Sequence, residues 1–252
     1  MSEIAEIILQ QAGEFGLVVE LGTVISPEIN ALVQQLTRLL AAQNQPGILE
    51  VVPTYRSVTV YFDPLVITRQ DLAASIRTLY TGIKPLKLAE LPARVVQVPV
   101  CYGGVLGPDL EFVARYTGLS AGEVIALHTN RPYLVYMLGF TPGFPYLGGL
   151  PEQLIVPRQE TPRSKVPAGS VGIGGNQTGL YPVESPGEWW LIGRTPLRAF
   201  DPQRSNPFLV TAGDYIQFVE IDSDEYFKIR REVATGNYCL QTKLYDGGGE
   251  AG

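Results

Sequence analysis

This chain of 252 residues is poor in the side chains that most often carry metal and redox chemistry. It has a single histidine, His128, and two cysteines, Cys101 and Cys239. One imidazole excludes a histidine-rich metal site and leaves at most one imidazole base. The cysteines are too far apart in sequence to form a CxxC pair, so neither a disulfide framework nor a thiolate metal site is expected. We predict no metal site and expect both cysteines to be buried thiols.

The chain is also short of positive charge and of long apolar runs. It has 19 Lys and Arg against 25 Asp and Glu, a formal net charge of -6, whereas a nucleic-acid-binding surface needs dense positive charge. No apolar run reaches the roughly 18 residues that span a bilayer. Glu3 and Glu6 stand where a signal peptide would have basic residues. These features predict a cytoplasmic protein that binds neither nucleic acid nor membrane.

Apolar residues, by contrast, are plentiful, at 45% of the chain, which is enough for the cores of two domains. In the first third, leucines, isoleucines and valines recur at helical spacing after Ser26-Pro27, an N-cap oxygen followed by a proline suited to the first helical position. A second helix is predicted after Thr68, with Asp71 three residues further on.

Alternating apolar residues predict strands around these helices, over residues 17–21, 48–52 and 58–62. A further strand near 82–88 would complete the order β-α-β-β-α-β. That order is typical of ferredoxin-like domains. We therefore predict a ferredoxin-like α/β sandwich over residues 1–93.

The pattern of predicted elements changes after Pro92. A strand is predicted at 95–100, followed by two short helices at 109–116 and 120–128, the second with Ser120 at the N-cap. Short β-prone runs then alternate with Gly- and Pro-containing turns, which is typical of a barrel or sandwich. Three of these runs are 134–137, 189–192 and 215–221. The predicted fold class is α+β, with a β-barrel over residues 94–252.

Three aromatic side chains gather around one Pro-Gly pair in the second predicted domain. Phe140, Phe144 and Tyr146 flank Pro142-Gly143, which fits the two central positions of a type II turn. Large rings on a rigid loop either cap the core or wall a pocket. The residues alone leave both interpretations open.

Basic residues are enriched in the same region. Residues 131–198 contain six Lys and Arg and four Asp and Glu, in a chain that is acidic as a whole. Arg158 and Arg163 each follow a proline, and guanidinium groups on stiff loops offer paired donors to a carboxylate or phosphate. This pattern favours an anionic ligand. The alternative is that each arginine pairs with a nearby carboxylate at the surface, which contributes little.

The segment 166–179 is rich in glycine but matches no known phosphate loop. It lacks the lysine of a P-loop, and Gln177 stands where the dinucleotide fingerprint has its third glycine. Ser170 does not fit the G-x-S-x-G elbow of a hydrolase. We expect the glycines to bring backbone N–H groups close to a ligand, with Ser170, Asn176, Gln177 and Thr178 as neutral hydrogen-bonding groups.

His128 has two interpretations. It lies at the end of a predicted helix, where an imidazolium would interact favourably with the helix dipole. It also lies just before the strand that leads to the aromatic loop, where it would be placed to act as a base. The sequence does not separate the two.

Several spaced motifs occur in one order over residues 128–196, and together they carry a resemblance. The motifs are His128-Thr129, Gly139-Phe140-Thr141-Pro142-Gly143-Phe144 with Tyr146, Pro157-Arg158, Pro162-Arg163, Val166 to Gly172, Gln177-Thr178-Gly179 with Tyr181, Ser185-Pro186-Gly187 with Trp189, and Ile192-Gly193-Arg194-Thr195-Pro196. In this order they resemble the allophanate hydrolase subunit 1 family. The likeness extends over nearly the whole chain. Two positions depart from it: Glu14 replaces an Asp, and Glu188 replaces the second Gly of a Gly-Gly-Trp turn.

The resemblance implies a ferredoxin-like domain followed by a cyclophilin-like barrel. It also implies a subunit, inactive alone, of an ATP-dependent 5-oxoprolinase, which works with a larger subunit of the allophanate hydrolase subunit 2 type and a third subunit. The ATP site would be shared with a partner, and an arginine would bind the substrate carboxylate. The family leaves two alternatives, an inhibitor that binds a sensor histidine kinase and a component of a urea or allophanate amidolyase.

The candidate site residues follow from these motifs. His128, Arg158 and Arg163 are the candidates for catalysis. The candidates for substrate binding are Phe140, Pro142, Gly143, Phe144, Tyr146, Ser170, Gln177, Thr178, Tyr181, Trp189 and Arg194.

Overall fold

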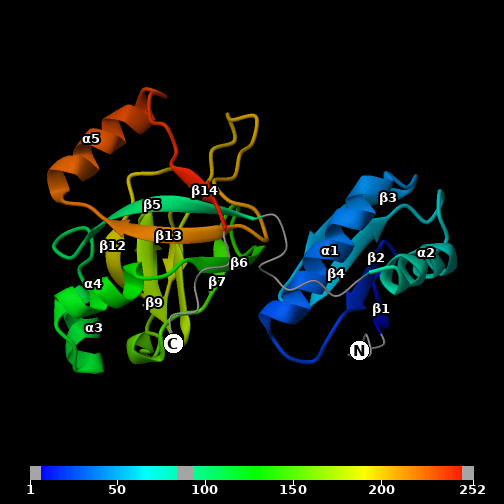
Figure 1. Ribbon diagram of the computed structural model, residues 1–252, viewed down its shortest axis with the longest axis horizontal. Helices are drawn as coiled ribbons and strands as arrows, with labels where there is room; N and C mark the ends of the chain where they lie inside the picture. The colour runs from blue at the N-terminus through cyan, green and yellow to red at the C-terminus, as the bar shows by residue number, and fades with distance from the viewer. Residues whose placement is uncertain (1–6, 84–92, 246–252) are drawn as a thin grey trace. The chain divides into compact units, whose positions relative to one another are not determined.

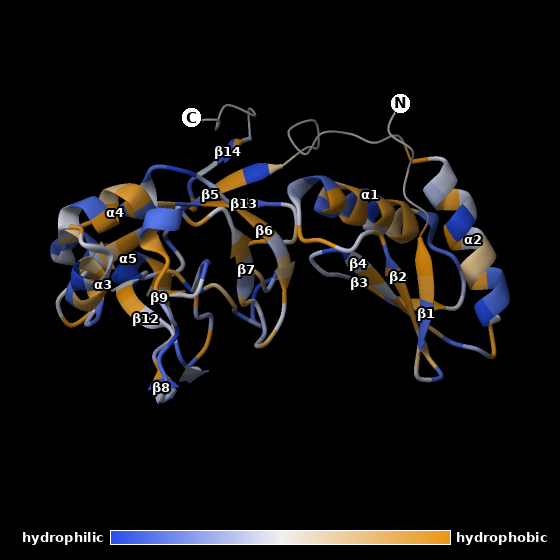
Figure 2. Ribbon diagram, turned by 90° about the horizontal axis from the view of Figure 1, so that it is seen from below, coloured by the Kyte–Doolittle hydropathy of each residue, from blue (hydrophilic) through white to orange (hydrophobic). Residues whose placement is uncertain are grey.

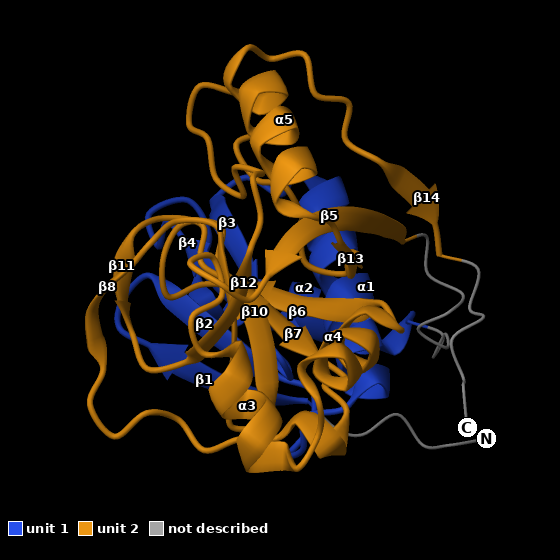
Figure 3. Ribbon diagram, turned by 90° about the vertical axis from the view of Figure 1, so that its left-hand side faces the viewer, with its two compact units in different colours: residues 1–92 blue, residues 93–252 orange. Residues whose placement is uncertain are grey.

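The computed structural model describes residues 7–83 and 93–245 (Figure 1). The chain divides into two compact units, Met1–Pro92 and Ala93–Gly252 (Figure 3). Each unit has its own apolar core. Over the described ranges, no helix combines the length and the apolar character that crossing a membrane requires.

The first unit is a four-stranded antiparallel sheet with two helices, in the strand order β1-β2-β4-β3. Its elements are β1 (Ile8–Ala12), β2 (Gly16–Glu20), α1 (Pro27–Gln43), β3 (Ile48–Pro53), β4 (Ser57–Phe62) and α2 (Arg69–Thr81). The side chain of Ser26 accepts a hydrogen bond from the backbone of Ile29, and that of Thr68 accepts one from Asp71. Both predicted N-caps are therefore confirmed.

Strand β1 is the element of this unit that the sequence did not predict. Its sequence, ILQQA, has no apolar alternation because most of its residues are exposed. It lies at the sheet edge beside β2. The strand predicted near 82–88 lies outside the described residues apart from Gly82 and Ile83, neither of which is in a strand. The ferredoxin-like assignment of this unit stays a prediction.

The second unit is a nearly closed barrel. Seven of its strands follow the order β10-β9-β12-β5-β13-β6-β7, β14 pairs with β5, and β11 pairs with β8 in a separate ribbon. β10 also contacts β7, so the two ends of the sheet meet. The strands are β5 (Arg94–Tyr102), β6 (Tyr133–Leu138), β7 (Pro145–Gly148), β8 (Arg163–Val166), β9 (Ser170–Gly174), β10 (Gln177–Leu180), β11 (Ser185–Gly187), β12 (Trp190–Arg194), β13 (Tyr215–Glu220) and β14 (Thr242–Leu244).

Helices cover part of this barrel. They are α3 (Leu110–Thr117), α4 (Ala121–Thr129), the short 3-10 helix η2 (Glu152–Leu154) and α5 (Ser223–Ala234). The side chain of Ser120 caps the backbone of Glu123, whose carboxylate bonds back to Ser120, so the predicted start of α4 is confirmed. The predicted helices and strands of this region are present, with ends that differ by a residue or two.

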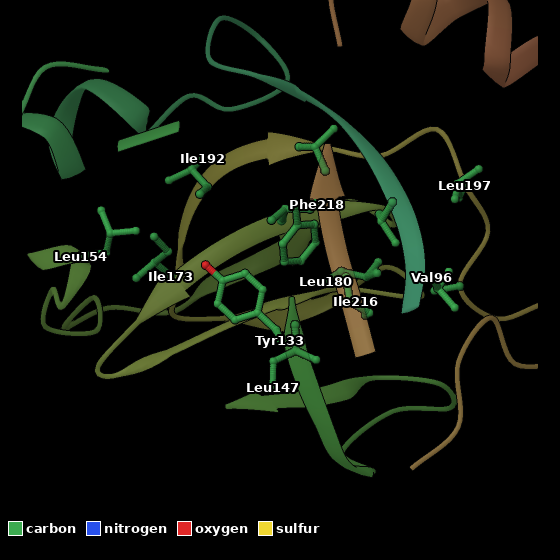
Figure 4. Packing of buried hydrophobic residues seen from close by; sticks show 14 of the residues in the cluster. Val96, Tyr133, Leu147, Leu154, Ile173, Leu180, Ile192, Leu197, Ile216 and Phe218 are labelled. Carbon is green, nitrogen blue, oxygen red and sulfur yellow. The ribbon is translucent and has the colours of Figure 1, made fainter. Parts of the chain in front are cut away.

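Large apolar side chains fill the barrel. Tyr133 and Phe218 lie near its centre, surrounded by aliphatic residues from the neighbouring strands (Figure 4). Hydrophobic residues also run along α1 of the first unit and β12 of the second (Figure 2). The prediction for the cysteines was half wrong: Cys101 is buried in β5, but Cys239 is exposed after α5. Cys239 lies between Tyr238 and Leu240, both of which pack against the barrel core.

Candidate functional site

A pocket of about 250 Å³ opens on the second unit, beside the loop that joins β6 to β7. We call it the aromatic pocket. Its lining residues are Phe140, Phe144, Tyr146, Arg158, Pro162, Gln177, Tyr181, Pro186, Gly187, Glu188 and Trp189. The volume is below the range of about 300–1,000 Å³ that is usual for drug-sized ligands. The pocket therefore suits a small molecule such as a single ring.

Phe144 is the centre of the aromatic wall. Its ring makes edge-to-face contacts with Phe140, Tyr146, Tyr181 and Trp189, at centroid distances of 5.5, 5.4, 5.4 and 5.6 Å. Such contacts add to the stabilisation that burial gives. Phe144, Tyr181 and Trp189 are buried, whereas Phe140 is exposed. The buried rings of the cluster thus form a small core, and its outer side forms a pocket wall. Both interpretations of the aromatic residues, a core cap and a pocket wall, therefore apply.

The loop that carries these rings has the predicted turn. The backbone N–H of Phe144 donates to the carbonyl of Thr141 at 3.1 Å, and Gly143 has φ +80°, as a type II turn requires. Pro142 and Gly143 therefore shape the loop without lining the pocket. Phe140, just before the turn, has φ +64°, and the residue is 65% exposed. A bulky residue in this region of backbone space is strained, and strain of this kind concentrates at functional sites.

The hydroxyl of Tyr181 is a neutral polar group in the pocket wall. Burial raises the pKa of Tyr181 to about 12, while a hydrogen bond from the backbone of Trp189 opposes that rise. The side chain lies directly against Gly187, where a Cβ atom would be 2.4 Å from the hydroxyl oxygen. Only glycine fits there. The wall therefore offers an un-ionised phenol at neutral pH.

Arg158 forms the polar edge of the pocket. Its Nη1 lies 2.6 Å from Oε1 of Glu188, and its Nη2 donates to Oε1 of Gln177 at 2.9 Å. In the sequence, Glu188 stands out only as a departure from the family, so its place in the site was missed. Pro162, Pro186 and Gly187 were missed as well, although all three lie in the family motifs. These three residues carry no reactive group, so residue chemistry gives no signal for them.

Arg163 and Arg194 do not line the pocket. Arg163 donates to Asp109 Oδ1 at 2.8 Å and to the backbone of Trp189 at 3.3 Å. The second oxygen of Asp109 accepts from the backbone of Leu191 at 2.7 Å, so Arg163 joins β8 to the start of α3 and to β12. Arg194 donates to the backbone carbonyl of Ala168. Both arginines support the structure around the pocket.

These contacts favour the surface-pair interpretation of the basic residues. Arg158 pairs with Glu188, Arg163 with Asp109, and Lys165 with Glu184 at 3.5 Å. Each positive charge is thus already opposed by a carboxylate. The expected cluster of unopposed cations for an anionic ligand is not formed by these three residues.

The glycine-rich segment forms the hairpin β9–β10, and its glycines make room for Trp189. A Cβ atom on Gly174 would lie 2.4 Å from Cδ1 of Trp189, and one on Gly179 would lie 3.1 Å from its Cζ3. The indole therefore lies directly against the backbone of the hairpin. Ser170 and Thr178 are buried and do not line the aromatic pocket, whereas Gln177 does.

His128 lies in the last turn of α4, but its ring is fully buried in the barrel core. Nδ1 lies 2.8 Å from the hydroxyl of Tyr102, and Nε2 lies 2.8 Å from the hydroxyl of Thr178. Burial lowers the pKa of His128 to about 3. The imidazole is therefore neutral at pH 7, so it neither caps the helix dipole nor reaches a substrate. We assign His128 to the core.

Within residues 7–83 and 93–245, no group of three or more His, Cys, Asp or Glu side chains is placed to hold a metal ion. The groups that line the aromatic pocket are suited to recognition: aromatic rings, one ion pair, an amide and the un-ionised hydroxyl of Tyr181.

Comparison with known proteins identifies the family. Residues 7–210 match the carboxyltransferase domain, subdomain C and D. A 5-oxoprolinase subunit of Bacillus subtilis is 42% identical over 233 residues, which cover 89% of this chain and 97% of that protein. The protein of the same name from Escherichia coli O157:H7 is 43% identical over 208 residues, covering 82% of this chain and 93% of that protein.

A solved structure has the same fold. The crystal structure of TTHA0988 superimposes with a TM-score of 0.74 at 38% identity, covering 82% of this chain. The matched part is 40% of that longer chain. On the extent of these matches, the chain belongs to the family of carboxyltransferase domains, subdomain C and D.

Proposed function

We propose that this chain is a non-autonomous subunit of an ATP-dependent 5-oxoprolinase. The reaction would convert 5-oxo-L-proline, ATP and water to L-glutamate, ADP and phosphate. The observation that carries the proposal is the 42% identity to the 5-oxoprolinase subunit of Bacillus subtilis over 97% of its length. Similarity over 89% of this chain and 97% of that subunit favours a shared role in the same kind of complex.

The aromatic pocket supports a role in substrate binding. Its size suits a five-membered ring, and Phe140, Phe144 and Tyr146 would contact the faces and edges of that ring. Arg158 and Gln177 would contact its polar groups. Tyr181 and Trp189 complete the wall. Of the residues first considered for catalysis, only Arg158 touches this pocket, so we propose binding and orientation as the contribution of this chain.

ATP would bind at a site that a partner helps to form. Opening a lactam is difficult because an unactivated amide reacts slowly, and phosphoryl transfer to its carbonyl oxygen would activate it for attack by water. Stabilising that transfer needs several positive charges or a metal ion close together. The sequence has no phosphate-binding loop, and the arginines around the pocket are paired with carboxylates. A larger subunit of the allophanate hydrolase subunit 2 type and a third subunit would supply the missing groups.

We further propose a cyclophilin-like barrel, a ferredoxin-like first unit whose edge strand is β1, and a cytoplasmic location. The histidine-kinase inhibitor finds no support in the names of the relatives described above. An amidolyase component would need carboxylase and amidase modules from elsewhere.

Reconstitution tests the proposal. The purified chain should show no ATP hydrolysis that depends on 5-oxoproline, and it should gain this activity when it is combined with the two partner subunits. Omission of this chain from the complete set is the control. If the complete set is inactive on 5-oxoproline, or is equally active without this chain, the proposal fails.

A further inference from the structure

The ion pair between Arg158 and Glu188 at the edge of the aromatic pocket offers hydrogen-bond donors beside an acceptor. This arrangement suits the amide of a lactam better than a carboxylate. This inference rests on the proposed function and concerns the same site. We infer that Arg158 and Glu188 together recognise the amide edge of a lactam ring rather than a carboxylate.

The pair presents a donor and an acceptor side by side. Nη1 of Arg158 lies 2.6 Å from Oε1 of Glu188, and Nη2 is bonded to Gln177. A guanidinium has five N–H donors, so these two contacts leave donors unused. Among the described residues, Oε2 of Glu188 accepts no hydrogen bond. The pair therefore still offers N–H groups on one side and a carboxylate oxygen on the other.

A lactam has the matching pattern. Because its C–N bond lies within a small ring, the amide is held cis, with the N–H donor and the C=O acceptor on the same edge. The carbonyl oxygen would accept from Arg158, and the ring N–H would donate to Glu188. Hydrogen bonds to charged groups are the stronger ones. Both amide groups are satisfied at once by one ion pair.

A carboxylate fits the same edge poorly. It has two acceptors and no donor when ionised, so it would satisfy Arg158 but repel Glu188. The charge of Arg158 is already opposed at 2.6 Å. A carboxylate would have to displace Glu188 before it could form a paired contact.

The surroundings of the pair favour ring recognition. The side chains of Arg158 and Glu188 are 48% and 37% exposed, so a ligand can reach both. Next to them, Phe144 and Trp189 are buried against each other and offer an apolar wall to the ring carbons. The carboxylate of 5-oxoproline is carried by the tetrahedral ring carbon next to the nitrogen, so it would leave the ring plane beside the amide edge and would need a cation other than Arg158.

Small ring compounds that differ in whether they have the amide N–H, the amide carbonyl or a carboxylate test the inference. Binding is measured by ligand-observed NMR titration on the purified chain, and by competition with 5-oxoproline in the reconstituted enzyme. The probes are 2-pyrrolidinone, which has the whole amide edge; N-methyl-2-pyrrolidinone, which lacks the N–H; and cyclopentanecarboxylate, which has a ring and a carboxylate but no amide. We expect 2-pyrrolidinone to bind about tenfold tighter than either of the other two, which corresponds to one lost hydrogen bond to a charged group.

The variant Glu188→Gln removes the charge of the side chain at position 188 and leaves its size almost unchanged. It keeps an oxygen that can accept the lactam N–H but removes the negative charge opposite Arg158. The preference for 2-pyrrolidinone over cyclopentanecarboxylate should fall by about tenfold, because an unopposed guanidinium accepts a carboxylate. The control is Glu184→Gln, which removes a carboxylate that pairs with Lys165 outside the pocket. It should leave the preference unchanged.

The inference is overturned if cyclopentanecarboxylate binds as tightly as 2-pyrrolidinone, if N-methylation has no effect, or if no lactam binds. Its failure is distinct from that of the proposed function. An enzyme that turns over 5-oxoproline but prefers the carboxylate probe refutes only the role of the pair. An inactive reconstituted set with a chain that still prefers 2-pyrrolidinone refutes only the oxoprolinase assignment.

Discussion

Nε2 of His128 lies 2.8 Å from Oγ1 of Thr178 inside the barrel, and the imidazole is the donor of this hydrogen bond. The Thr178 hydroxyl donates its one hydrogen to the carbonyl of Gly172 at 3.1 Å, so its oxygen accepts from His128. Nδ1 of His128 then accepts from the hydroxyl of Tyr102 at 2.8 Å. The ring also stacks on Phe218 at 4.6 Å. The only histidine of the chain is thus a neutral, fully bonded core residue.

The first prediction concerns this role. His128→Gln should lower the free energy of unfolding by about 2–3 kcal/mol, because buried hydroxyl groups lose their partners. The turnover of 5-oxoproline per folded enzyme should stay close to that of the wild type. Denaturant unfolding of the chain and steady-state kinetics of the reconstituted enzyme check the two parts. Thr178→Val, which removes the acceptor, should destabilise the chain in the same way. A large loss of kcat in a normally folded His128→Gln enzyme would restore a catalytic role.

The second prediction concerns pH. The pKa of His128 is lowered from its usual 6.5 to about 3 in the folded chain, so the unfolded chain binds a proton between these values that the folded chain does not. The stability from the neutral ring is fully present above pH 6.5. It should be lost as pH falls from 6.5 toward 3, by up to about 1.4 kcal/mol per pH unit. Denaturant unfolding over this range should show a shallower dependence in His128→Gln than in the wild type.

The third prediction concerns the glycines under Trp189. In Gly174→Ala the new Cβ would lie 2.4 Å from the indole, so Trp189 must move. We expect a loss of about 1–3 kcal/mol in unfolding free energy, as for overpacked cores, and a higher KM for 5-oxoproline. Gly122→Ala in α4, which meets no atom within 4 Å, is the control. It should keep the wild-type KM and be at least as stable, because alanine favours helix. An unshifted KM in Gly174→Ala would separate Trp189 from the substrate site.

Much of the fold was predictable because the local sequence signals for helices and strands agree with the tertiary packing. The starts of α1, α2 and α4 are fixed by side-chain caps at Ser26, Thr68 and Ser120, which can be read directly from the sequence. Strand β1 could not be read, since its residues are mostly exposed and its place is decided by pairing with β2. Edge strands with little burial leave a weak sequence pattern.

The site was predictable only in part. The aromatic loop and Gln177 come together at the pocket because their motifs lie on neighbouring parts of one barrel. Chemistry alone could not predict that His128 points inward, since either orientation is compatible with a helix end. It also could not separate Arg158 from Arg163. Both follow a proline, and only the tertiary structure pairs Arg158 with Glu188 at the pocket and Arg163 with Asp109 outside it.

The fourth prediction concerns the strained residue at the pocket rim. Phe140 has φ +64°, which glycine adopts without cost and alanine does not. Phe140→Gly should therefore be about 1 kcal/mol more stable than Phe140→Ala. Both variants lose the ring and should raise the KM for 5-oxoproline to a similar degree. Equal stability of the two would argue against backbone strain at this position, and an unchanged KM in both would remove Phe140 from the substrate site.

The central claim is that the aromatic pocket of this chain binds the substrate of an oxoprolinase, and Arg158→Lys in the reconstituted enzyme tests it most directly. Lysine cannot contact Glu188, Gln177 and a ligand with the fixed geometry of a guanidinium. The control Arg198→Lys alters an arginine that pairs with Asp201 and does not line the pocket. We predict that Arg158→Lys lowers kcat/KM for 5-oxoproline by about 10- to 100-fold, equivalent to roughly 1–3 kcal/mol, while Arg198→Lys leaves it unchanged. A wild-type kcat/KM in an active Arg158→Lys enzyme would contradict the claim.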